Sequence, residues 1–288
     1  MLIQVFDSTG HQRAVGSGFI ASSNGEIITN YHVIRGATRG RIKYHDSTVA
    51  QVLGATAYDP DHDVAVLKAG RVSGPVLQLG DPDQLQVGQK LVAIVSPLGL
   101  QDTLTEGIVS AKRENLIQMS VPISPGSSGG PVLDTQGHAV GIAVATVIKG
   151  QNLNFAVPVS WAKRYLGSAT VRPLADISAE NLVTESVLDG NYSVAAGQIL
   201  TREFQVDPNS MAFPELEGQV SSRGGFTGNI SFALVYNGVP IYACNRQTSC
   251  VLPKRELKPG TYAAVIDNRG SMMFKRDVTA SLTLRYVK

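Results

Sequence analysis

One serine lies in a glycine-rich segment whose residue types suit nucleophilic catalysis. Ser128 occurs in Ser124-Pro-Gly-Ser-Ser-Gly-Gly-Pro131, where glycines on both sides permit a tight, strained turn that exposes a nucleophile. We expect Gly126, Ser127 and Ser128 to form an oxyanion hole with the N–H groups of Gly126 and Ser128 as donors, each contributing about 3 kcal/mol to transition-state stabilisation. Glycine-serine runs also occur in hairpins and linkers, so the motif needs partners.

A histidine and an aspartate lie where the other two roles of a triad would be filled. His32 follows the apolar residues 26–28, and a neutral imidazole there can take the serine proton and return it to the leaving amine. Asp63 opens the apolar run 63–68 and would orient His32 and stabilise its imidazolium. The other histidines lie in polar, turn-like sequence and are expected at the surface: His11, His45, His62 and His138.

The aspartate segment has a competing interpretation as a calcium loop. Asp59, Asp61 and Asp63 alternate as the ligands of such a loop do. A calcium loop needs a glycine next and an acidic residue near its end, whereas this chain has Val64 and Gly70. We therefore expect no metal and no other cofactor.

Composition predicts an all-β chain in two domains. A length of 288 residues suits two domains, and the 29 glycines with many valine and threonine runs are typical of short strands joined by turns. We expect a first domain over residues 1–170, closed by a helix at 161–166 with Ser160 as its cap, and an antiparallel β-sandwich over 171–288. Strands are expected over 17–21, 26–29, 64–68, 90–95 and 107–111, then over 198–206, 219–222, 229–236, 261–266 and 279–286.

Charge and apolar patterning limit the partners. The formal net charge is only +2 and the basic clusters are followed by glutamates, so nucleic acid is not an expected partner. No stretch is long enough for a membrane-spanning helix, and the first residues lack the pattern of a signal peptide. Cys244 and Cys250 flank a short polar loop; a disulfide there would fit an oxidising compartment, and two reduced thiols in the cytoplasm are the alternative.

Several segments together resemble a known family, the trypsin-like serine proteases, and most closely the bacterial HtrA/Deg branch. The resemblance covers about half of the chain and implies two six-stranded antiparallel β-barrels, with His32, Asp63 and Ser128 in the cleft between them. It also implies a bacterial periplasmic or extracellular location, with the signal peptide removed; the cytoplasm is the alternative. The matching segments are 16–20, 29–34, 63–68, 79–82, 95–100, 107–110, 125–131 and 155–158.

The chain also departs from that family. Ser127 and Ser124 stand where the family usually has asparagines, and serine is tolerated there in related proteases. No carboxylate-binding loop of the Gly-Leu-Gly-Phe type follows, so we expect no PDZ domain.

The resemblance also indicates a substrate preference. The primary pocket of this fold is walled by the residues before the nucleophile and by a later strand, here Pro122, Ile123, Asn154, Phe155 and Ala156. All five are uncharged, and a pocket without a buried acid would not compensate the desolvation of an arginine or lysine. We expect cleavage after small or medium aliphatic residues, unless a loop elsewhere supplies a charge.

Two functions follow. The first is a serine endopeptidase that acts on protein or peptide substrates through an acyl-enzyme at Ser128, as a monomer or a homo-oligomer. The alternative is a catalytically silent protease-fold protein that acts as a binding module. Because degenerate relatives usually lose a triad residue and none is lost here, the sequence favours the endopeptidase.

Overall fold

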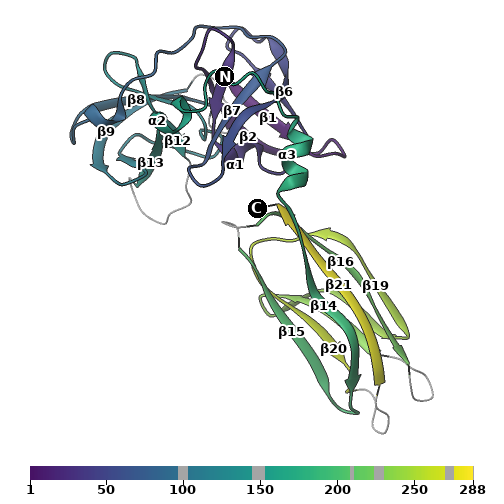
Figure 1. Ribbon diagram of the computed structural model, residues 1–288. Coiled ribbons are helices and arrows are strands. Elements are labelled where there is room, and N and C mark those ends of the chain that lie inside the picture. The colour runs from purple at the N-terminus through teal and green to yellow at the C-terminus, as the bar shows by residue number, and fades with distance from the viewer. Residues whose placement is uncertain (97–102, 145–152, 208–210, 224–229, 270–275, 288) are drawn as a thin grey trace. The chain divides into compact units, whose positions relative to one another are not determined.

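The computed structural model describes residues 1–96, 103–144, 153–207, 211–223, 230–269 and 276–287 (Figure 1). Contacts divide the chain into two compact units, Met1–Glu180 and Asn181–Lys288. Among the described residues, no helix is long and apolar enough to cross a membrane.

The first barrel occupies the N-terminal part of the first unit. Its seven strands have the order β2-β1-β5-β6-β7-β4-β3. Because β2 and β3, at opposite ends of this order, are separated in sequence only by Gly18, they act as one bent strand that joins both ends of the sheet. The elements are β1 Leu2–Phe6, β2 Gln12–Ser17, β3 Phe19–Ile20, β4 Glu26–Thr29, α1 Tyr31–Ile34, β5 Arg39–Lys43, β6 Val49–Asp59 and β7 Val64–Ala69.

The second barrel is closed, with the strand order β10-β13-β12-β11-β8-β9. The 3-10 helix η1 (Pro82–Gln84) precedes it, and two short helices follow it, α2 (Val159–Lys163) and α3 (Leu174–Glu180). The strands are β8 Lys90–Val95, β9 Thr103–Lys112, β10 Ile117–Met119, β11 Pro131–Leu133, β12 Ala139–Val144 and β13 Asn154–Pro158.

Strand β7 shows how apolar side chains hold the two barrels together. Its alternate residues Ala65 and Leu67 lie in the core of the first barrel. Val64 and Val66 point the other way, into an apolar cluster with Ile142 and Val157 of the second barrel. Both faces of the strand are therefore buried, which explains why its sequence is apolar without a polar alternation.

The first unit extends further than predicted. The boundary falls after Glu180 rather than after residue 170. Leu174 and Ile177 of α3 are buried in the core of the first barrel, and Arg172 forms an ion pair with Glu180. The residues expected to be a linker therefore belong to the first unit.

The closing helix also differs from its prediction. Helix α2 begins at Val159 with Pro158 at the N-cap, and its cap has no side-chain hydrogen bond. Ser160 is thus inside the helix rather than its cap. Proline suits this position because the first N–H groups of a helix have no partner within it.

The second unit is a β-sandwich. Two four-stranded antiparallel sheets, ordered β14-β21-β16-β19 and β15-β20-β17-β18, form the sandwich (Figure 1). They enclose one apolar core that includes Leu216, Phe232 and Leu282. In the sequence, this sandwich follows the first unit, from Asn181 onward. The strands are β14 Leu182–Val194, β15 Ile199–Val206, β16 Ala212–Arg223, β17 Ile230–Tyr236, β18 Val239–Gln247, β19 Ser249–Glu256, β20 Gly260–Asp267 and β21 Arg276–Val287.

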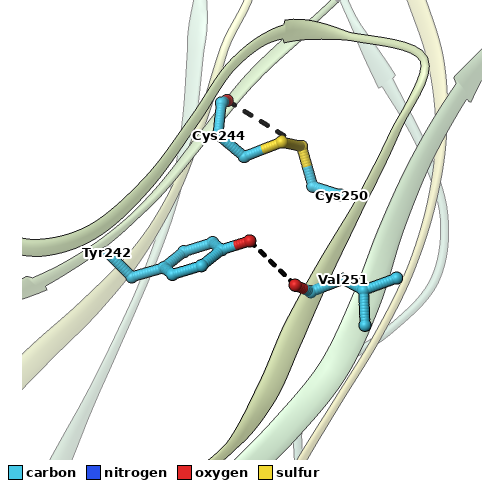
Figure 2. Close-up of a disulfide and its surroundings, with 4 residues drawn as sticks. All are labelled: Tyr242, Cys244, Cys250 and Val251. Atoms are coloured by element: carbon cyan, nitrogen blue, oxygen red, sulfur yellow. Dashed lines mark hydrogen bonds between the residues drawn. A yellow bond between two sulfur atoms is a disulfide. The ribbon is translucent and has the colours of Figure 1, made fainter.

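A disulfide joins two strands of the sandwich. Cys244 of β18 and Cys250 of β19 are bonded, with their Cα atoms 6.0 Å apart (Figure 2). Beside it, Tyr242 Oη donates a hydrogen bond to the Val251 carbonyl at 2.8 Å (Figure 2). Because β18 and β19 lie at the edges of different sheets, the disulfide links the two sheets covalently.

Candidate active site

The pairing of β4 with β7 brings the predicted base and acid together. In this antiparallel pair Thr29 lies opposite Ala65. His32 follows Thr29 by one short turn, in α1, and Asp63 precedes Ala65 by two residues. The two side chains therefore meet at the same end of the strand pair.

Asp63 contacts His32 through both carboxylate oxygens. Its Oδ2 lies 2.7 Å from Nδ1 of His32, and its Oδ1 accepts the backbone N–H of His32 at 2.8 Å. An acceptor at Nδ1 favours the tautomer with its proton there, which leaves Nε2 able to accept a proton. The geometry is that of an oriented general base.

The backbone of Asp63 is also held in an unusual conformation. Its φ is +54°, in the left-handed region that non-glycine residues seldom adopt. The Asn30 side chain donates a hydrogen bond to the Asp63 carbonyl at 2.9 Å. Asn30 is buried and precedes α1, so it ties the His32 segment to the Asp63 backbone.

Asp59 stabilises the turn that leads to Asp63. Its Oδ1 accepts the N–H groups of Asp61 and His62, each at 3.1 Å, and its Oδ2 lies 2.8 Å from both Nδ1 of His62 and Oη of Tyr165. Burial raises the pKa of Asp59, but the hydrogen bonds from Tyr165 and His62 outweigh it, and the net effect lowers this pKa.

These contacts bear on two expectations. The prediction that His62 lies at the surface is wrong, because its ring stacks on Trp161 and its side chain is only 24% exposed.

The carboxylates of Asp59 and Asp63 are engaged by hydrogen-bond donors, which is unlike a calcium loop. Among the described residues, no group of three or more His, Cys, Asp or Glu side chains could hold a metal ion.

Ser128 lies in a tightly hydrogen-bonded loop between β10 and β11. Gly126 has φ +93° and Gly129 has φ +90°, so both require the conformational freedom of glycine. The Ser127 N–H donates to the Ser124 carbonyl at 2.9 Å, and the Gly130 N–H donates to the Ser127 carbonyl at 3.1 Å. The N–H of Ser127 is therefore engaged within its own turn.

Close contacts place this loop against the segments that carry His32. The Ser128 carbonyl accepts the N–H of Ser17 at 2.7 Å. A Cβ on Gly129 would lie 2.2 Å from Thr29 Oγ1, and one on Gly16 would lie 2.7 Å from Val33, the neighbour of His32. The fold thus gathers the segments of the three predicted triad residues at one place, where Ser128 is 5% exposed.

The predicted pocket residues lie in strand β13 of the second barrel and in the segment between β10 and the nucleophile loop. Asn154 and Phe155 are half-buried in β13, opposite Met119 and Gln118 of β10. The other three differ in exposure. Pro122 is exposed, Ile123 packs against the core of the second barrel, and Ala156 lies inside that core. All five are uncharged. Residues 97–100 of one family-like segment lie outside the described residues.

Comparisons with known proteins identify relatives of this chain. Residues 16–142 match the family described as Trypsin-like peptidase domain. The putative serine protease HhoB of Synechocystis sp. is 36% identical over 195 residues, covering 63% of this chain and 43% of that protein. A probable periplasmic serine endoprotease, DegP-like, of Pseudomonas putida is 37% identical over 252 residues, covering 82% of this chain and 50% of that protein.

A solved structure gives the same result for the fold. The serine endoprotease from Yersinia pestis matches with a TM-score of 0.52 and 31% identity, covering 57% of this chain and 60% of that chain. The first unit is therefore a trypsin-like peptidase domain with the chymotrypsin-like double barrel. Within that class its relatives are HtrA/DegP-like serine proteases, which confirms the predicted resemblance. The chain spans at most about half the length of the curated relatives described above.

Three polar residues of this site were not singled out from the sequence. Ser17, Thr29 and Asn30 are all buried. Ser17 donates a hydrogen bond to the Ser128 carbonyl, Asn30 donates to the Asp63 carbonyl, and Thr29 donates to the carbonyl of Ser17. All three lie in segments that resemble the family. In the sequence they are polar residues at or just beyond the end of a strand: Ser17 ends β2, Thr29 ends β4 and Asn30 follows it.

Proposed function

We propose that this chain is a serine endopeptidase that hydrolyses peptide bonds through an acyl-enzyme at Ser128. The observation that carries the proposal is the two-point contact of Asp63 with His32, at 2.7 Å to the ring and 2.8 Å to the backbone N–H. A histidine so oriented has Nε2 available for a serine hydroxyl. The peptidase names of the relatives support the same reaction class.

The proposed reaction has two halves. Nε2 of His32 takes the proton of Ser128 Oγ as the oxygen attacks the scissile carbonyl carbon, and Asp63 stabilises the resulting imidazolium. The N–H groups of Gly126 and Ser128 are the proposed donors to the oxyanion. The imidazolium then protonates the leaving amine, and a water repeats the sequence to release the acid and restore Ser128.

The proposed specificity is for small or medium aliphatic residues before the scissile bond. Pro122, Ile123 and Phe155 offer apolar surface, and Asn154 is neutral. A cationic side chain would lose its hydration there without gaining a partner. We expect a valine substrate to have a kcat/KM about 10- to 100-fold above that of its lysine counterpart.

The proposed location is the bacterial periplasm or the exterior of the cell. The disulfide between Cys244 and Cys250 suits an oxidising compartment. The relative from Pseudomonas putida is named a periplasmic protease.

Hydrolysis of casein by the purified chain and by its Ser128→Ala variant tests the proposal. We expect the variant to lose about 10⁶-fold in kcat, as a comparable triad does without its serine. Mass spectrometry of the products gives the cleavage sites, and a peptidyl phosphonate should label Ser128 in the wild type alone. Equal activity in both chains would contradict the proposal, and an inactive, unlabelled wild type would indicate a binding module.

A further inference from the structure

Ser17, at the end of β2, connects the nucleophile loop to both barrels. It is 1% exposed, and its three polar atoms take part in four hydrogen bonds with other segments. Its N–H donates to the Ser128 carbonyl at 2.7 Å, and its carbonyl accepts Thr29 Oγ1 at 2.8 Å. Its Oγ donates to the Gly126 carbonyl and accepts the Ser96 N–H, both at 2.9 Å.

The contact with Gly126 bears on the direction of the proposed oxyanion donors. A trans peptide unit is planar with its C=O and N–H pointing in opposite directions, so fixing either group fixes the whole plane. Ser17 Oγ holds the carbonyl of the peptide between Gly126 and Ser127, and the Ser124 carbonyl holds the N–H of the same peptide. The Gly130 N–H holds the carbonyl of the next peptide, whose N–H belongs to Ser128.

We propose that Ser17 is a positioning residue for the oxyanion hole. Its hydroxyl fixes the plane of the peptide between Gly126 and Ser127. This peptide lies between the two proposed donors, the N–H groups of Gly126 and Ser128, so its orientation sets the angle between them. Glycine at position 126 would otherwise rotate freely through conformations in which its N–H points elsewhere. This inference rests on the proposed function of Ser128 as a nucleophile.

The second hydrogen bond of the Ser17 hydroxyl, from the Ser96 N–H, links the nucleophile loop to the end of strand β8 in the second barrel. Ser96 follows β8 and is buried, and its N–H can reach Ser17 Oγ only when the end of β8 lies against β2. Ser17 belongs to the first barrel. The geometry of the oxyanion hole is thereby coupled to the contact between the two barrels.

The test compares Ser17→Ala with Thr56→Val in the full chain. Thr56 is a buried hydroxyl of β6 that donates to the Val66 carbonyl, so its loss removes one internal hydrogen bond away from the nucleophile loop. For Ser17→Ala we expect kcat to fall about 10- to 100-fold, less than the 10²- to 10³-fold lost when an oxyanion donor itself is removed. KM should stay within about twofold, because an interaction made only in the transition state does not affect substrate binding.

A second readout reports directly on the oxyanion site. A peptidyl boronate forms a tetrahedral adduct with the serine, whereas a non-cleavable peptide of the same sequence binds only the ground state. We expect Ser17→Ala to weaken the boronate by the same factor as kcat and to leave the peptide unchanged. Ser17→Cys keeps a weak donor of similar shape and should give intermediate values. If Ser17→Ala does not fold, Ser17→Cys carries the same comparison by itself.

Each outcome decides between the alternatives. Loss of kcat and boronate affinity in the Ser17 variants, with Thr56→Val close to wild type, supports the positioning role. A Ser17→Ala enzyme with full kcat, or one whose KM alone rises, overturns it while leaving the Ser128 chemistry intact. A wild type without Ser128-dependent hydrolysis overturns the proposed function and this inference together.

Discussion

The ring of His62 stacks on the indole of Trp161, with centroids 3.2 Å apart and planes inclined by 18°. His62 immediately precedes Asp63, and Trp161 lies in α2, which follows the last strand of the second barrel. On the same indole, the Arg164 guanidinium lies 4.1 Å from the ring centroid. The turn that presents Asp63 is thus packed against the other barrel's C-terminal helix.

Replacement of Asp59 tests whether that turn positions Asp63. Asp59→Ala removes the acceptor for Asp61, His62 and Tyr165, and hydrogen bonds to a charged group contribute about 1–3 kcal/mol to the unfolding free energy, so we expect a loss of that size. We also expect kcat to fall by about tenfold, because the left-handed Asp63 loses its support.

The matched control for this change is Asp59→Asn. Its amide oxygen can still accept the N–H groups of Asp61 and His62, so the turn should persist. Denaturant unfolding and steady-state kinetics measure both effects. If Asp59→Ala and Asp59→Asn have equal kcat values, the turn does not position Asp63.

Asp63→Asn tests the acid of the proposed triad. The amide can keep one oxygen on the His32 N–H, but its NH₂ group would then face Nδ1 and favour the wrong imidazole tautomer. We expect kcat to fall about 10⁴-fold with little change in KM, as for the same change in a comparable triad. Steady-state kinetics on a peptide substrate gives both constants. A loss below about tenfold would remove Asp63 from the proposed mechanism.

The sequence predicts strands well where apolar runs are short and bounded by turns. Strands β4 and β8 have the predicted bounds, Glu26–Thr29 and Lys90–Val95. A regular alternation of buried and exposed side chains does not hold along β6, Val49–Asp59. Its pairing with β7 shifts register between Val52 and Gly54 and again between Ala55 and Ala57. Each bulge reverses which side chains face the core, so no single period runs through the strand.

The candidate site likewise contains residues that the sequence predicts and residues that it does not. Local motifs suffice to nominate His32, Asp63 and Ser128, because each follows or opens a recognisable element. Ser17 is different, since its hydroxyl bonds Gly126 and Ser96, which lie 109 and 79 positions away in the sequence. Contacts of that range depend on how the two barrels pack, and no local pattern encodes them.

Acid stability should depend on Asp7. Burial raises its pKa, but hydrogen bonds from Thr9 and His11 and the charge of Arg13 outweigh burial and lower the pKa from 3.8 to about 2. Because the pKa of Asp7 is lower in the folded chain, its ionised carboxylate stabilises the fold in full when the pH is above the ordinary pKa of 3.8. This stabilisation is lost as the pH falls toward the folded-state pKa of about 2. Asp7→Asn should therefore melt a few degrees below wild type near neutral pH, with the difference vanishing near about pH 2.

Thermal melts of both chains across this range measure the effect. Glu114→Gln, which removes an exposed carboxylate from the second barrel, serves as the control and should show no such convergence. A Tm difference for Asp7→Asn that persists at the lowest pH would mean that the charge of Asp7 is not what stabilises the connection between the paired strands β1 and β2.

The disulfide of the sandwich should stabilise the second unit alone. Cys244 and Cys250 are six positions apart, and closing so short a loop restricts the unfolded chain by about 2 kcal/mol in the entropy model. We expect the Cys244→Ser/Cys250→Ser double variant to lower the unfolding free energy of residues 181–288 by about that amount and to leave casein hydrolysis unchanged, because the proposed triad lies in the other unit. Hydrogen exchange resolves the two units, and wild type treated with a reductant is the matched comparison. Lost protection in the barrels, or a fall in kcat, would show instead that the sandwich supports the protease domain.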